Sequence, residues 1–172
     1  SWYRRQRQMC IRDSYKTRLK DITTFILDVD GVMTNGKIIY THDGKIDRQF
    51  YAKDGYAIKY AISKGYRIAI ISGGMQENVR TRLNSLGVED VFLKAFNKIE
   101  VYEKFIKEKK IDPKNILYMG DDNPDLDVLK VVGISSCPND ASVDVKSICD
   151  YISHKDGGCL LYTSPSPRDQ SG

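Results

Sequence analysis

Short apolar runs alternate with longer amphipathic stretches along most of this chain. The apolar runs are three to six residues long and rich in β-branched side chains, which predicts buried strands. We predict six of them, at Thr23–Asp28, Arg67–Ile71, Asp90–Leu93, Ile116–Met119, Ile134–Cys137 and Tyr151–Ser153. Helical spacing of apolar residues between them predicts helices at Gly55–Lys64, Gln76–Leu86, Lys98–Glu108, Pro124–Val131 and Ser142–Ser147. This alternation predicts an α/β fold, a doubly wound parallel sheet with helices on both faces.

One segment departs from the strand–helix rhythm directly after the first strand. Two short segments, Lys37–Tyr40 and Asp47–Tyr51, flank the dipeptide Asp43-Gly44. Asp-Gly favours a type I′ turn, which requires positive φ at both central positions, so we predict a β-hairpin that is too small to be a cap domain. Because an isolated two-stranded hairpin is only marginally stable, we expect it to associate with another copy. The apolar positions available for that contact are Ile38, Tyr40 and Ile46.

The two ends of the chain lack the alternating pattern and differ from the body in composition. Residues 1–20 hold seven Lys and Arg against one Asp, and residues 159–172 include a Ser-Pro-Ser-Pro run. We interpret both as disordered or foreign sequence, with a native basic tail as the alternative, and place one domain at residues 21–158. The chain is +4 overall, but residues 21–158 carry 19 basic and 21 acidic side chains. That balance argues against a nucleic-acid-binding surface.

The sequence gives no sign of a membrane span or of export. No apolar run approaches the roughly 20 residues that cross a bilayer, and no apolar segment follows the basic start as in a signal peptide. Cys10, Cys137, Cys149 and Cys159 show neither a CxxC motif nor Cys/His metal-binding spacing. We therefore expect a reduced, cytoplasmic protein in which Cys137 and Cys149 are small buried groups.

Two carboxylates, Asp28 and Asp30, stand at the end of the first predicted strand. Burying an unpaired charge is costly, so carboxylates in this position indicate a use. Mg²⁺ prefers carboxylate oxygens and keeps coordination positions open for a substrate phosphate. One carboxylate is then suited to attack phosphorus while the other moves protons.

Three further strands end in polar groups, and ligands of doubly wound sheets bind at the carboxyl ends of strands. Ser72-Gly73-Gly74 offers a hydroxyl and backbone N–H groups that suit a phosphate. Lys98 begins a predicted helix, and Gly120-Asp121-Asp122 with Asp125 could complete a magnesium site with Asp28. Each signal alone is more often a turn, a solvated lysine or an N-cap. Their order and their common edge favour one catalytic site.

These residues, in this order, resemble the haloacid dehalogenase superfamily of phosphatases. Asp28–Thr34 matches its DxDGxxT motif, Ser72 the second motif, Lys98 the third, and Gly120–Asp125 the GDDxxD fourth motif. The hairpin in place of a cap narrows the resemblance to the capless 3-deoxy-D-manno-octulosonate 8-phosphate phosphatase family. Two further segments are similar to that family, Phe50–Tyr56 and Lys155–Gly158. The resemblance covers about residues 21–158 and implies the Rossmann-like haloacid dehalogenase fold without a cap domain.

What the resemblance implies is a Mg²⁺-dependent phosphomonoester hydrolase that acts through an aspartyl-phosphate and releases Kdo and phosphate for lipopolysaccharide synthesis. Asp28 is then the nucleophile and a Mg²⁺ ligand. Asp30 is the acid and base and lends its backbone carbonyl to the metal, and Asp121 is the remaining protein ligand. Asp122 or Asp125 supports these groups from behind, while Ser72 and Lys98 hold the phosphoryl oxygens. The family further implies a homotetramer in which hairpins associate and a neighbouring subunit helps to cover each active site.

The resemblance also implies a set of substrate-binding positions. They are Asp30, Tyr51, Ala52, Lys53, Asp54, Gly55, Lys59, Gly73, Gly74, Arg82 and Lys98. Lys53, Lys59 and Arg82 could pair with a carboxylate of the substrate. The alternative for Lys59 and Arg82 is a solvated helix face, and Asp54 could be only a helix N-cap.

Two departures from the family pattern concern the substrate. Gly74 stands where close relatives often have a basic residue. The family's C-terminal tail, with a further glycine and an arginine that reaches the active site, is replaced by Cys159–Tyr162 and the Ser-Pro run. We expect weakened substrate closure or release from this second difference.

Three other functions stay open. A phosphatase of a nine-carbon sialic-acid-type 9-phosphate would use the same chemistry. A non-catalytic sugar-phosphate-binding module is a second alternative, against which the intact Asp28, Asp30, Lys98 and Asp121 speak. A phosphate-receiver domain also uses an aspartate with Mg²⁺, but it would leave the acid–base role of Asp30 unexplained and would hold its phosphate much longer.

Overall fold

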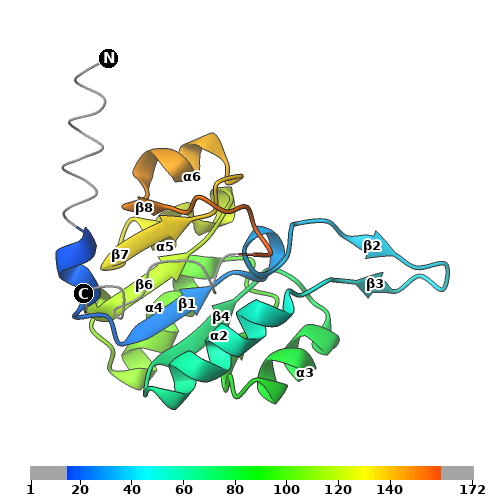
Figure 1. Cartoon of the computed structure of the whole chain (residues 1–172), viewed down its shortest axis with the longest axis horizontal. Coiled ribbons are helices and arrows are strands. Elements are labelled where there is room, and N and C mark those ends of the chain that lie inside the picture. The colour runs from blue at the N-terminus through cyan, green and yellow to red at the C-terminus, as the bar shows by residue number, and fades with distance from the viewer. Residues whose placement is uncertain (1–14, 160–172) are drawn as a thin grey trace.

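The computed structural model describes residues 15–159, and its centre is a six-stranded sheet (Figure 1). The strands are β1 (Thr24–Leu27), β4 (Arg67–Ile71), β5 (Asp90–Phe92), β6 (Ile116–Met119), β7 (Ile134–Cys137) and β8 (Tyr151–Ile152). All neighbours pair in parallel, in the order β5-β4-β1-β6-β7-β8. Every predicted strand is therefore present. Strand β1 lies between β4 and β6, with Leu27 opposite both Ile70 and Met119, so the end of β1 is central at the carboxyl edge.

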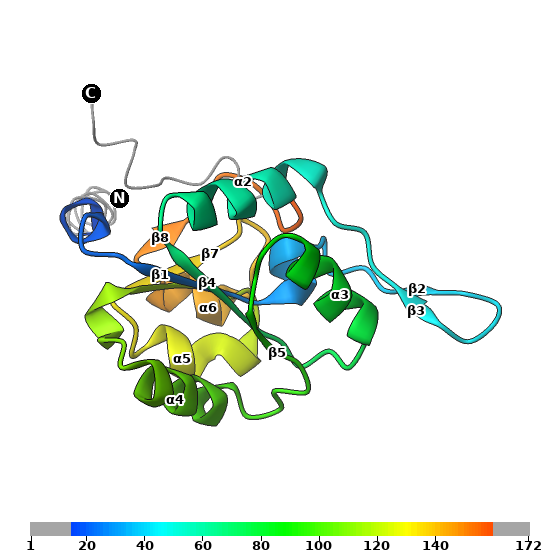
Figure 2. The ribbon, with the colours of Figure 1, turned by 90° about the horizontal axis from the view of Figure 1, so that it is seen from below.

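Helices cover both faces of the sheet, as predicted (Figure 2). On one face lie α2 (Ala52–Ser63) and α3 (Glu77–Ser85), and on the other lie α4 (Lys98–Lys109), α5 (Leu126–Leu129) and α6 (Val143–Ile148). Alternate residues of β4 enter the two cores, Ile68 and Ile70 with α2 and α3, Ala69 and Ile71 with the other three helices. Both faces of the strand are buried, which explains its unbroken apolar sequence.

The predicted hairpin follows the first strand and projects away from the sheet (Figures 1 and 2). Its strands β2 (Ile39–Tyr40) and β3 (Ile46–Asp47) are antiparallel and shorter than the predicted segments, and β3 begins one residue before the second of them. Gly44 in the turn has a φ of +78°, but Asp43 lacks the positive φ that a type I′ turn also requires, so the predicted turn type is wrong although the hairpin is present. The side chain of Tyr40 is 74% exposed, and Ile38 and Ile39 are exposed beside it.

Two of the predicted helices differ from the observed ones by more than one residue at an end. Helix α2 begins at Ala52, three residues before Gly55, because the N–H of Gly55 already donates to the carbonyl of Tyr51. Asp54 is therefore buried in the first turn and is not the N-cap that the alternative interpretation made it. The predicted helix at Pro124–Val131 divides into η3 (Asn123–Asp125) and α5. A shorter turn, η2 (Pro113–Asn115), precedes β6.

The packed part of the chain begins before the predicted boundary at residue 21. Residues 15–19 are helical, and Tyr15, Leu19 and Ile22 form a small core with Leu117 and Ile134. Their spacing of four and three residues is that of one helix face, a signal that the many surrounding Arg and Lys concealed. The rest of the predicted tails, residues 1–14 and 160–172, lies outside the described residues.

Two smaller expectations are also addressed by the structure. Cys137 and Cys149 are free and buried in the core, as predicted. Within residues 15–159, no helix is long and apolar enough to cross a membrane.

The packing of residues 15–19 predicts a loss of stability on truncating Leu19, which is 2% exposed. Leu19→Ala is expected to lower the free energy of unfolding by about 2–4 kcal/mol, because it removes buried methyl groups and leaves a cavity. Urea denaturation followed by circular dichroism measures this, with the exposed Lys20→Ala as the matched control. Equal stability of the two variants would contradict the assignment of this segment to the domain.

Candidate active site

Asp28 follows β1 directly and is held in place by the turn that begins there. Its N–H donates to the carbonyl of Met119 at 3.0 Å, and its Oδ1 accepts the N–H of Val29 at 2.7 Å. The turn is η1 (Val29–Met33), in which Asp30 and Gly31 leave helical geometry. Asp28 is only 6% exposed, so its carboxylate needs a partner.

That partner is Lys98, the first residue of α4. Its Nζ lies 2.8 Å from Oδ2 of Asp28 and 2.7 Å from Oδ1 of Asp125. All three side chains are buried, so the ammonium group is enclosed between two carboxylates. The arrangement leaves the Asp28 carboxylate paired and fixed in direction.

Asp125 has every position on its two oxygens taken by donors. Its Oδ1 accepts from Tyr118 and Lys98, and its Oδ2 accepts the backbone N–H groups of Asp121 and Asp122. Asp125 thereby shapes the loop after β6 and has little capacity left to bind a cation. Asp122 is exposed and caps η3 by accepting the N–H of Asn123 at 2.8 Å. Asp125 therefore contacts Lys98 and the Asp121 loop directly, whereas the contact of the Asp122 carboxylate is with η3.

Asp121 completes a cluster of carboxylates with Asp28 and Asp125. One oxygen of each lies within 4.8 Å of the others. Gly31 allows this approach, because its φ of +83° suits glycine and a Cβ there would overlap the carboxylate of Asp121. Since the oxygens of Asp125 are occupied, Asp28 and Asp121 are the pair that fits a divalent cation. Hard oxygen donors of this kind suit Mg²⁺.

The electrostatics of this pair also fit a cation. Burial, and then the charge of Asp125, raise the pKa of Asp28 to about 7, although Lys98 opposes them. Burial and the charges of Asp28 and Asp125 raise the pKa of Asp121 to about 7. Burial lowers the pKa of Lys98, but the charges of Asp28 and Asp125 outweigh burial, so the pKa of Lys98 is raised. A positive ion between Asp28 and Asp121 would favour their ionised forms.

Ser72 directly follows β4, the strand beside β1, and is buried. Its backbone is fixed by bonds to Phe92 and Ala95, and its Oγ accepts the N–H of Gly74 at 3.2 Å. Gly73 in this turn is exposed, so the turn faces solvent beside the end of β1. The hydroxyl and the turn backbone are therefore at the same sheet edge as Asp28.

Asp30 is paired with a residue that the sequence reasoning missed, Arg48. The Nε and Nη2 of Arg48 donate to the two carboxylate oxygens of Asp30 at 2.6 and 2.8 Å. A third donor, Nη1, lies 2.6 Å from Oε1 of Gln76. Arg48 is a single basic residue that follows the hairpin and belongs to none of the motifs. The one signal in the sequence is its position directly after the predicted hairpin turn region. Tyr118 was missed for a similar reason, since it reads as an ordinary strand residue.

Some of the predicted substrate positions contact other residues named above, and the rest lie on or beside α2. Arg82 reaches the start of α2, where its Nη2 lies 3.1 Å from the Cβ position of Gly55, and Gly74 lies beside Arg48. The remaining positions lie at the start of α2 or along it, with Asp54 buried and the others exposed. They are Tyr51, Ala52, Lys53, Asp54 and Lys59.

The segment Lys155–Gly158 packs on the turn that carries Asp30. The N–H of Gly158 donates to the carbonyl of Val32 at 2.8 Å, and that of Gly157 donates to Asp140 at 2.9 Å. A Cβ at Gly157 would overlap the carbonyl of Gly31. This close approach explains why glycine stands at position 157, within the segment Lys155–Gly158 that resembles the family.

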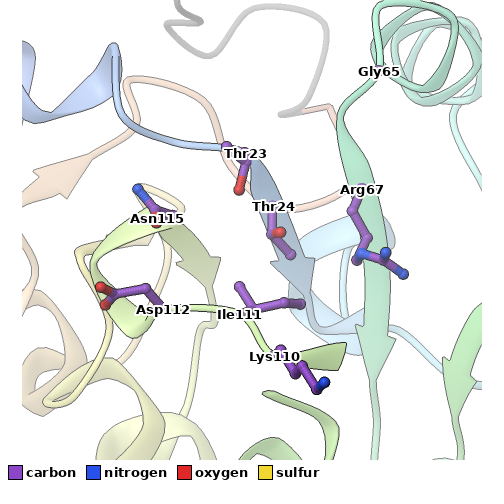
Figure 3. A pocket seen from close by; sticks show the side chains of 8 residues that line it. All are labelled: Thr23, Thr24, Gly65, Arg67, Lys110, Ile111, Asp112 and Asn115. Atoms are coloured by element: carbon purple, nitrogen blue, oxygen red, sulfur yellow. The ribbon is translucent and has the colours of Figure 1, made fainter. Parts of the chain in front are cut away.

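A cavity of about 310 Å³ lies at the opposite, amino edge of the sheet (Figure 3). It is lined by Thr23, Thr24, Gly65, Arg67, Lys110, Ile111, Asp112 and Asn115. The guanidinium of Arg67 is committed to Asp90 at 3.0 Å, and Asp112 is the single carboxylate of the lining. The cluster of Asp28, Asp121 and Asp125 therefore lies at the sheet edge opposite this cavity.

Sequence comparison places the chain among phosphatases. Residues 87–157 match the haloacid dehalogenase-like hydrolase family. The chain is 33% identical over 142 residues to a 3-deoxy-D-manno-octulosonate 8-phosphate phosphatase of Salmonella typhi, covering 83% of this chain and 76% of the relative. The phosphatase of the same name from Haemophilus influenzae is 30% identical over 141 residues, 82% of this chain and 78% of the relative.

Solved structures agree with this assignment. The 3-deoxy-D-manno-octulosonate 8-phosphate phosphatase of Moraxella catarrhalis, in complex with magnesium ion, phosphate ion and KDO, superposes with a TM-score of 0.82 at 29% identity, covering 85% of this chain and 84% of that one. The enzyme of Yersinia pestis gives 0.81 at 30% identity, over 83% and 77%. The family predicted from the four motifs and the capless fold is confirmed. The chain belongs to the 3-deoxy-D-manno-octulosonate 8-phosphate phosphatase family of haloacid dehalogenase-like hydrolases.

Proposed function

We propose that this protein is a Mg²⁺-dependent phosphatase that converts 3-deoxy-D-manno-octulosonate 8-phosphate to Kdo and inorganic phosphate. The observation that carries the proposal is the buried carboxylate of Asp28, paired with Lys98 at 2.8 Å and clustered with Asp121 at the carboxyl edge of the sheet. The related Moraxella catarrhalis structure, which contains magnesium ion, phosphate ion and KDO, supports this choice of substrate and metal.

In the first step, a carboxylate oxygen of Asp28 forms a bond to phosphorus, and the bond from phosphorus to the sugar oxygen breaks. The electron pair of that bond goes to the sugar oxygen, which takes a proton from Asp30. Lys98 offsets the repulsion between the Asp28 carboxylate and the phosphate. We assign the binding of phosphoryl oxygens to the hydroxyl of Ser72 and the N–H of Gly73, which belong to the turn after β4.

In the second step, Asp30 takes a proton from water and the water oxygen bonds to phosphorus. The bond from phosphorus to Asp28 then breaks, which restores Asp28 and releases phosphate. Mg²⁺, held by Asp28, Asp121 and the backbone carbonyl of Asp30, supplies neutralisation of the phosphoryl charge when bound. The protein contributes mainly position and fixed charge.

For the sugar acid, we propose the positions at the start of α2 together with Arg82. The guanidinium of Arg82 lies against Gly55, and Lys53 and Lys59 are exposed on the same helix. Arg82 and Lys53 lie at the start of α2 and Lys59 lies further along it, and cationic side chains of this kind suit a carboxylate of the substrate.

The proposal extends to a cytoplasmic homotetramer joined through the hairpin. Exposed Ile38, Ile39 and Tyr40 on a projecting two-stranded hairpin form an apolar surface of the kind that association buries. The buried free thiols of Cys137 and Cys149 are in keeping with a reducing compartment.

Asp28→Asn is expected to reduce phosphate release by more than about a thousandfold, because the amide is not a nucleophile. Phosphate release is measured with Mg²⁺ on eight-carbon and nine-carbon sugar-acid phosphates, with the exposed Asp127→Asn as the matched control. Release from the nine-carbon acid alone would change the substrate and keep the mechanism. A folded wild type that releases phosphate from neither would favour the binding module.

Binding of Mg²⁺ is expected to weaken below about pH 7, because the protons of Asp28 and Asp121 must leave first. Their raised pKa values mean that the metal-free folded state binds more protons than the unfolded state between about pH 4 and 7. Its stability therefore falls as the pH rises through that window. The Mg²⁺-induced rise in Tm should be larger at pH 8 than at pH 6 and absent in Asp121→Asn. A rise independent of pH would contradict this assignment of the metal ligands.

Light scattering coupled to size exclusion tests the hairpin contact. The wild type is expected to elute as a tetramer and Tyr40→Glu as a smaller species, because a charge would be buried at the interface. Val143→Glu, which changes an apolar residue of α6 that is 82% exposed, is the matched control and should remain tetrameric. A monomeric wild type would refute association through the hairpin.

A further inference from the structure

Arg48 connects three parts of the molecule that are separate in the sequence. It lies one residue after β3, at the base of the hairpin. Its guanidinium reaches Asp30 on the η1 turn and Gln76 at the start of α3. Although the hairpin itself is exposed, the Arg48 side chain is only 5% exposed. A buried arginine with three donors in use is fixed in position.

The contact with Asp30 is of the two-pronged kind that sets orientation. Two parallel N–H donors, Nε and Nη2, meet the two carboxylate oxygens at 2.6 and 2.8 Å. This geometry fixes the plane of the carboxyl group as well as its distance. The Asp30 side chain is itself 31% exposed, so without Arg48 it would be free to rotate toward solvent.

The far side of Arg48 is fixed by the loop after β4. Oε1 of Gln76 accepts from Arg48 at 2.6 Å and also from the N–H of Met75 at 3.2 Å. Gly74 has no side chain to displace the guanidinium, and its Cβ position lies 3.3 Å from Nη2 of Arg48 and 3.4 Å from Oγ of Ser72. Arg48 thus occupies the space between the proposed phosphoryl-binding turn and Asp30.

We propose that Arg48 is a positioning residue for Asp30, which it aims at the oxygen of the leaving sugar. The inference rests on the proposed function, in which Asp30 protonates that oxygen as the bond to phosphorus breaks. When Asp30 carries the proton, its carbonyl oxygen still accepts from Arg48 while its hydroxyl faces the leaving group. Because Arg48 adjoins β3, the position of the hairpin also sets the position of the Arg48 guanidinium.

A positioning role for Arg48 predicts a dependence on the leaving group. An alkyl oxygen must be protonated as it departs, whereas the nitrophenolate of p-nitrophenyl phosphate departs without a proton. The value of kcat/KM reports only the steps up to the departure of this group. In Arg48→Met, kcat/KM for 3-deoxy-D-manno-octulosonate 8-phosphate should fall about a hundredfold, the usual scale for general-acid catalysis. For p-nitrophenyl phosphate it should change less than about threefold.

Glycerol 3-phosphate serves as a third substrate, since it has an alkyl leaving group and no carboxylate. Its kcat/KM should fall by the same factor as that of the sugar-acid phosphate. Arg80→Met, which removes an arginine that pairs with Glu77 and the carbonyl of Val91, is the matched control and should leave all three values unchanged. Arg48→Lys, which keeps the charge but not the two-pronged contact, should show the same selectivity with a smaller loss. If Arg48→Met does not fold, the comparison is made with Arg48→Lys instead.

Two results would overturn the inference alone. An equal fall for all three substrates would assign Arg48 a purely structural role. A fall confined to the sugar-acid phosphate would mean that Arg48 binds the substrate carboxylate. A wild type that releases phosphate from none of the three would instead overturn the proposed function, and the inference with it.

Discussion

The ammonium group of Lys98, enclosed between the carboxylates of Asp28 and Asp125, is the interaction on which the site depends. Burying an ion costs several kcal/mol, and removing one partner of a buried pair costs about 3–5 kcal/mol. A lysine at the first position of a helix is further disfavoured by the helix dipole. The two carboxylates offset both penalties. In return, Lys98 fixes the direction of the Asp28 carboxylate.

The sheet order brings these groups together. Strand β1 lies between β4 and β6, so Asp28 at its end has the Ser72 turn on one side and the loop of Asp121 on the other. This central position is the switch point where doubly wound sheets bind their ligands. The η1 turn is packed on two sides, because Gly31 lies against Asp121 in the loop after β6 and Gly157 lies against the carbonyl of Gly31. The proposed catalytic residues are thus placed by strands and by backbone contacts.

Strands, helices and motif residues could be predicted from the sequence because each leaves a local signal. The apolar runs of β4 and β6 are unbroken since both of their faces are buried, and the motifs recur at strand ends. The helical residues 15–19 were missed because the surrounding positive charge conceals the spacing of Tyr15 and Leu19. Arg48 could not be predicted at all. Its role depends on Asp30 and Gln76, which only the folded hairpin brings within its reach.

In the proposed reaction, Asp28, held by Lys98, carries the phosphoryl group between the two steps. Sodium borohydride reduces an aspartyl-phosphate to homoserine, which tandem mass spectrometry locates in the sequence. Quenching the enzyme with borohydride during turnover of its sugar-acid phosphate should place homoserine at position 28 and leave Asp30 and Asp121 unchanged. Homoserine at another aspartate, or none during measured turnover, would contradict the account.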